Sequence, residues 1–115
     1  MASDLIIKTK DFVFELFKNE LEPTFLYHNF KHTERVYKST KEIIENSEVS
    51  EVDKQILELT AWLHDTGYTK GAENHEERSV EIATEFLNGQ NVDSKIIEEV
   101  NKCIMATKFN DQPKT

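Results

Sequence analysis

The chain has 115 residues, which is enough for one domain with a single hydrophobic core but not for two independent domains. Hydrophobic residues make up 37% and charged residues 31%, a balance typical of a soluble globular protein and not of a disordered one. The formal net charge of -8 would repel a phosphate backbone, so we expect no binding of bulk nucleic acid. A small phosphorylated ligand is still allowed, because a bound divalent cation can dominate the potential of one pocket.

The chain carries no sign of export. Cys103 is its only cysteine, so it cannot form an internal disulfide bond. The first residues, from Met1 to Lys10, lack the charged and then apolar pattern of a secretion signal. No segment approaches the roughly 18 consecutive apolar residues that cross a bilayer. We therefore expect a cytoplasmic protein with no membrane-spanning segment in this chain.

Two helices are predicted in the first part of the chain. Apolar residues recur at near-helical spacing from Leu5 to Leu21, and Asp4 can cap this first helix. Pro23 breaks it, and the aromatic-rich segment from Thr24 to Asn29 is predicted as a connector. A second helix follows and ends near Asn46.

The third predicted helix leads into the most distinctive dipeptide of the sequence. Ser50 and Asp53 resemble a capping pair at its start. The helix then becomes apolar on nearly all sides, which is expected of a central, buried helix, and it ends at His64 and Asp65.

Two further helices complete the predicted fold. After a short loop with two glycines, Asn74 can cap a fourth helix and Gly89 can close it. A fifth helix runs from about Asp93 to Thr107, and the polar tail from Phe109 to Thr115 is predicted as a loop or frayed end. Since no convincing strand is found, we expect an all-α, single-domain bundle of about five helices over residues 1–115.

The histidines lie in three short segments. His28 and His32 are four residues apart, so both project from one helix face if the second helix begins early enough. If that helix begins only at Asn29, His28 lies just outside its first turn and can still lean over the same pocket. The three segments read YHNFKHTERV, AWLHDTGY and NHEERSV.

His64 and Asp65 favour a metal site. An imidazole and a carboxylate without partners would be costly to bury at the end of an apolar helix, and a divalent metal would satisfy both. These ligand types suit Zn, Mn, Fe, Ni or Co better than Ca or Mg, and the absence of thiolates argues against a structural zinc site. A lone His-Asp pair is usually a surface or capping feature, so the metal hypothesis depends on all three segments together.

Taken together, YHNFKHTERV, LHDTGY and NHEERS resemble the HD domain superfamily of metal-dependent phosphohydrolases, over roughly Leu26 to Thr107. The resemblance implies a helical bundle around one or two divalent metal ions. Besides the transition metals named above, Mg is also allowed. It also implies hydrolysis of a phosphate mono- or diester, often in a nucleotide or cyclic nucleotide. By the family pattern, His32, His64 and Asp65 match the first three metal ligands.

The resemblance also implies roles in catalysis. YHNFKH is similar to a segment of cyclic-nucleotide phosphodiesterases in which the first histidine protonates the leaving oxygen, a role that maps to His28. Histidine titrates in the right range for a neutral-pH acid. Asp65, or the metal itself, would position the attacking hydroxide. The alternative for His28 is an aromatic-loop histidine bonded to a carbonyl.

Three further residues are weaker candidates. His75 can bind a second metal, contact a phosphate or only cap the fourth helix, and these alternatives stay open. Arg35 and Lys70 are candidate phosphate contacts, although both residue types are more often ordinary surface residues.

The expected fourth ligand has no clear counterpart. HD domains usually supply an aspartate from a later helix, and Asp111 lies in that neighbourhood but in a polar tail. We therefore expect a C-terminally incomplete metal site. This keeps open a regulatory or ligand-binding module without turnover, and, less strongly, a di-iron oxygenase.

Overall fold

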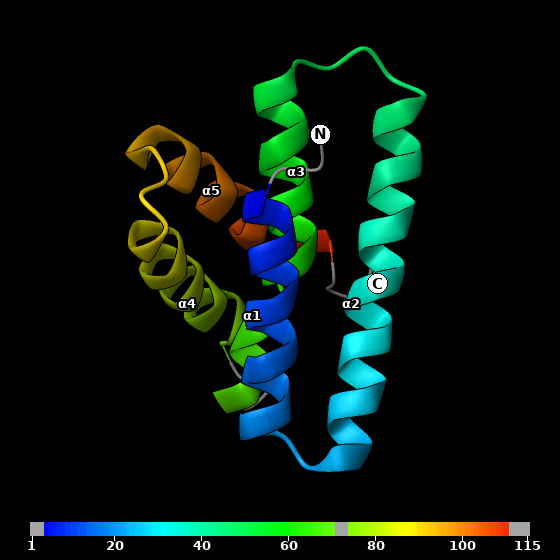
Figure 1. Cartoon of the computed structure of the whole chain (residues 1–115), viewed down its shortest axis with the longest axis vertical. Coiled ribbons are helices and arrows are strands. Elements are labelled where there is room, and N and C mark those ends of the chain that lie inside the picture. Colours follow the sequence, from blue (N-terminus) through cyan, green and yellow to red (C-terminus); the bar gives the residue numbers. More distant parts are fainter. Residues whose placement is uncertain (1–3, 71–73, 111–115) are drawn as a thin grey trace.

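The computed structural model describes residues 4–70 and 74–110, and their side chains except those of 23–25, 27, 28, 70 and 107–110. Within this part of the chain there are five α-helices, one 3-10 helix and no strand, which confirms the all-α prediction (Figure 1). The elements are α1 (Asp4–Glu20), α2 (Pro23–Glu45), α3 (Glu51–Leu63), η1 (Thr66–Lys70), α4 (His75–Gly89) and α5 (Ser94–Asn110). None of the described helices is long and apolar enough to cross a membrane.

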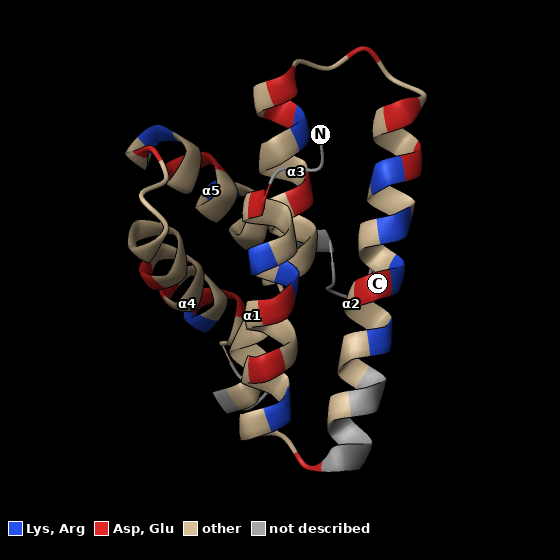
Figure 2. Ribbon diagram, viewed as in Figure 1, with Lys and Arg blue, Asp and Glu red and all other residues tan. Residues whose placement is uncertain are grey.

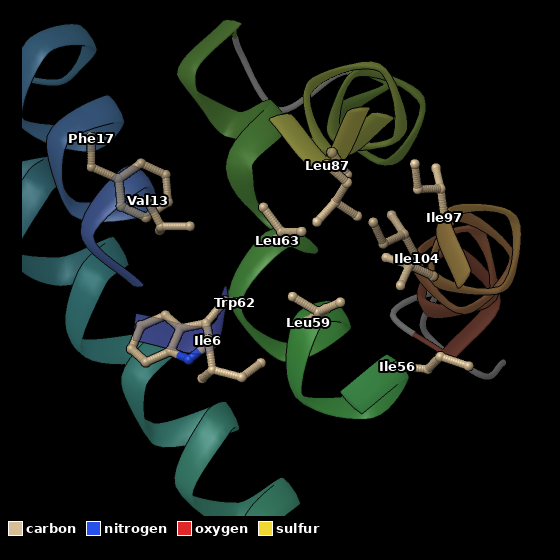
Figure 3. Close-up of a cluster of buried hydrophobic side chains, with 12 residues drawn as sticks. Ile6, Val13, Phe17, Ile56, Leu59, Trp62, Leu63, Leu87, Ile97 and Ile104 are labelled. Carbon is tan, nitrogen blue, oxygen red and sulfur yellow. The ribbon is translucent and has the colours of Figure 1, made fainter. Parts of the chain in front are cut away.

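Helix α3 is the centre of the bundle, as its apolar pattern predicts. It contacts all four other α-helices. Leu59 and Leu63 are fully buried and Trp62 is 1% exposed (Figure 3). Burying a side chain of this size stabilises the fold by about 1.5–3 kcal/mol. The core around α3 therefore fixes the end of this helix, where His64 and Asp65 follow.

The start of α3 also follows the prediction. Ser50 is the N-cap residue, and its hydroxyl oxygen accepts a hydrogen bond of 3.1 Å from the backbone N–H of Asp53. This bond satisfies one of the free amides of the first turn. At the other end, the backbone N–H of His64 donates to the carbonyl of Thr60, so the helical path reaches His64 itself.

The connector predicted between the first two helices is wrong. Helix α2 already begins at Pro23, so the backbone from Thr24 to Asn29 is helical. The physical reason is that proline at the first helical position loses no hydrogen bond and has a suitable φ angle. Consequently His28 and His32 lie four positions apart on one helix.

Two predicted helix ends also differ. Asn74 occupies the predicted N-cap position of α4, but it adopts a left-handed conformation (φ 58°) and makes no side-chain cap bond. Gly89 is the last residue of α4, as predicted, and the left-handed conformation lies two residues beyond it at Asn91. Helix α5 continues through Asn110, past the predicted start of the polar tail, and the rest of that tail lies outside the described residues.

Candidate metal centre

The side chains of His32, His64 and Asp65 converge at one point. Nε2 of His32, from α2, lies 3.3 Å from Oδ2 of Asp65. Nε2 of His64, at the end of α3, lies 3.1 Å from the same oxygen. One ligand atom from each of the three residues lies within 4.8 Å of the others. The packing of α2 against α3 thus brings these residues together, which the sequence alone did not show.

These spacings fit a shared cation. Nitrogen and oxygen ligands lie about 2.1 Å from a transition metal, so two neighbouring ligand atoms are about 3.0 Å apart in octahedral and about 3.4 Å apart in tetrahedral geometry. The two imidazole to carboxylate distances of 3.1 and 3.3 Å fall in this range. With all three ligand atoms within 4.8 Å of one another, this group could hold one ion.

The hydrogen bond of His64 supports the same conclusion. Its Nδ1 lies 2.9 Å from the backbone carbonyl of Ala61, and because a carbonyl only accepts, Nδ1 carries a proton. In the neutral imidazole, Nε2 then presents a lone pair to the anionic oxygen of Asp65. A second proton or a cation resolves this repulsion. A histidine anchored through its other ring nitrogen is the usual arrangement of a metal ligand.

The cluster is buried except on one side. The Asp65 side chain is 6% exposed and that of His64 11%, whereas that of His32 is 54% exposed. Burial alone would raise the pKa of the Asp65 carboxyl, but the hydrogen bond and charge of His64, with the charges of His32 and His75, hold that pKa below its ordinary value. Asp65 is therefore an anion that a ligand reaches from the side of His32.

His75 approaches the other oxygen of Asp65. It is the first residue of α4, and its Nε2 lies 3.7 Å from Oδ1 of Asp65 and 3.2 Å from Oε2 of Glu76. Its ring stacks on that of Tyr68 at 4.0 Å between centroids. A proton on Nε2 would thus lie between two carboxylates, and a second cation would replace that proton. The ligand role of His75 stays a prediction.

Sequence reasoning missed Glu76 and Tyr68. Glu76 is buried beside His75, yet an acid in the first turn of a helix has an ordinary explanation in the helix dipole. Tyr68 follows the glycine of the HDTGY segment and has no periodicity to mark it. Neither residue carries a local signal, since both owe their place to the packing of η1 against α4.

The described part of the structure does not place the other four candidate residues in the cluster. The side chains of His28 and Lys70, and the whole of Asp111, lie outside the described residues. Arg35 is exposed on α2, three positions after His32. The predicted roles of these four residues stay predictions.

The comparison with family models decides the relationship. The HD domain model matches residues 29–113, most of the chain. The chain belongs to the HD domain family. The match includes His32, His64, Asp65 and His75, and it begins one residue after His28. HD domains form a superfamily of metal-dependent hydrolases that bind divalent metals. Searches of curated proteins and of solved structures find no match.

Proposed function

We propose that this HD domain is a metal-dependent phosphohydrolase that cleaves a phosphate mono- or diester in a small molecule, a nucleotide or cyclic nucleotide. The observation that supports this is the convergence of His32 and His64 on Oδ2 of Asp65. Two neutral imidazoles and one carboxylate form a ligand set for Mn, Zn, Fe, Ni or Co. Such a centre with one accessible side suits hydrolysis better than a purely structural role.

A bound divalent ion would supply a Lewis acid for the phosphate oxygens and acidify a water molecule to form the nucleophile. Residues of the chain itself have the other roles. Ala61 orients the ring of His64, and Asp65 neutralises positive charge within a buried site. His28, one helical turn before His32 on α2, is the proposed proton donor to the leaving oxygen.

The charge on α2 supports an anionic substrate. The chain as a whole has a net charge of -8. Helix α2, by contrast, carries four basic and three acidic residues in its sequence, so the helix beside the open side of the cluster is not acidic (Figure 2). Two of these basic residues, Lys31 and Arg35, lie close to His32 in the sequence. We propose Arg35 and Lys70 as contacts of the substrate phosphate.

The test is hydrolysis of 4-nitrophenyl phosphate, bis(4-nitrophenyl) phosphate, nucleoside monophosphates and cyclic nucleotides by protein loaded with each candidate metal. We expect turnover that is lost in His64→Ala and kept in Asp53→Asn, a matched control in the exposed first turn of α3. Metal binding without turnover of any of these esters would favour the regulatory module instead. Turnover that survives in His64→Ala would contradict the proposed centre.

The position of His75 favours a second candidate, a dinuclear centre. Oδ1 and Oδ2 of Asp65 face different imidazoles, so Asp65 and His75 would be available to hold a second ion beside the first. Such a centre would serve a phosphohydrolase or, with iron, an oxygenase. Two metal ions per chain that fall to one in His75→Ala, together with oxygen uptake by the iron-loaded protein, would identify the oxygenase. Two bound ions without oxygen uptake would favour the phosphohydrolase instead.

A further inference from the structure

Ser79 connects α4 to the turn that carries Asp65. Its side chain is fully buried. Its hydroxyl accepts a hydrogen bond of 2.8 Å from the backbone N–H of Gly67 and donates one of 2.8 Å to the backbone carbonyl of His64. One side chain therefore holds both ends of the short segment in which Asp65 lies.

Gly67 shows how closely the two elements approach. A Cβ atom at this position would overlap the backbone oxygen of His75 and lie 2.8 Å from the backbone nitrogen of Ser79. The backbone of η1 thus lies directly on the first turn of α4, without room for a side chain. Because Asp65 lies just before Gly67 and His75 begins α4, this contact sets how close Asp65 and His75 lie.

We propose that Ser79 is a positioning residue of the metal centre, because its hydroxyl orients Asp65 toward His32 and His64. The inference rests on the proposed metal-dependent function. Without the hydroxyl, the carbonyl of His64 and the N–H of Gly67 would lose a buried partner, and such groups move to regain one. Since Asp65 lies between these two groups, its oxygens would leave the positions that a cation requires.

The experiment measures metal affinity by competition with a chelator and records the visible absorption of the cobalt-loaded protein. Ser79→Ala removes both hydrogen bonds, whereas Ser79→Thr keeps a hydroxyl. Thr9→Ala is the matched control, because Thr9 is also fully buried and its hydroxyl donates to the carbonyl of Leu5 within α1. Each variant is compared with wild type below its own unfolding temperature.

We expect Ser79→Ala to weaken metal binding by about 10- to 100-fold, the usual effect of removing an outer partner of a metal site, and to change the cobalt spectrum. Ser79→Thr should recover most of the affinity, and Thr9→Ala should lower thermal stability without changing affinity or spectrum. If Ser79→Ala does not fold, Ser79→Cys, with its weak donor and acceptor, should show the same loss to a smaller degree.

Wild-type affinity and an unchanged spectrum in Ser79→Ala, or an equal loss in Thr9→Ala, would overturn the role of Ser79. If metal binding still depended on His64 in that case, the proposed function would stand and only this inference would fall. A wild-type protein that binds none of the candidate metals would overturn both.

Discussion

The Nε2 atom of His64 lies 3.1 Å from Oδ2 of Asp65, although the two residues are adjacent in the chain. Adjacent residues within a regular helix do not face each other. Here the pair occurs where α3 ends and the chain passes into η1, so both side chains can point to one place. Because Nδ1 of His64 already donates to Ala61, the space beside Nε2 is suited to a cation.

Loss of either member of this pair should remove the metal. We expect His64→Ala and Asp65→Asn to contain far less bound transition metal than wild type, because each loses one of the three converging ligands. Elemental analysis of the purified proteins measures this. Asp53→Asn, which removes a carboxylate in the first turn of α3, should keep the wild-type stoichiometry. Unchanged metal content in both site variants would refute the ligand assignment.

Asp65 should make the metal-free protein sensitive to acid. Its pKa lies below 3.8 in the folded chain, so the unfolded chain takes up the proton first as the pH falls. The stabilisation by ionised Asp65 is therefore fully present above pH 3.8 and is lost as the pH drops through the lower folded value. Urea unfolding in chelator should show the difference in free energy between wild type and Asp65→Asn shrinking over that window. A difference that stays constant in acid would contradict this prediction.

Tyr37 should ionise at a higher pH than an ordinary tyrosine. Burial and the hydrogen bond that its hydroxyl donates to Glu58 raise its pKa from 10.0 to about 12. For an acid whose folded pKa is raised, stability is present below pH 10.0 and is lost as the pH rises toward 12. The phenolate absorbance of wild type should contain a late step that is missing in Tyr37→Phe. A variant that instead loses a step near pH 10.0 would show that Tyr37 ionises normally.

The core at α3 should be sensitive to cavities. Leu59→Ala removes a fully buried side chain at the centre of the bundle, and we expect a loss of about 3 kcal/mol in the free energy of unfolding. Val52→Ala at the start of the same helix is the control, because Val52 is 53% exposed and its loss should change stability by less than about 0.5 kcal/mol. Chemical denaturation measures both. Equal effects of the two variants would contradict the central position of α3.

The helices were predictable where local chemistry decides them. The Ser50 cap and the apolar pattern of α3 need no distant contact to be recognised. The segment after Pro23 was mispredicted because a proline stops one helix from continuing but also suits the first position of the next helix. Asn74 misled because its backbone, in a left-handed conformation, leaves the side chain without a cap bond.

The sequence by itself determined the helical class, the central helix and the residue types of a metal site, because periodicity, caps and the three histidine segments are local features. Only the tertiary structure decided that His32 on α2 meets Asp65 at 3.3 Å, since that distance depends on how α2 packs against α3. The same holds for Glu76 beside His75 and for Ser79 beneath the turn. Each of these contacts joins residues whose spacing is set by the packing of the core and not by the neighbouring sequence.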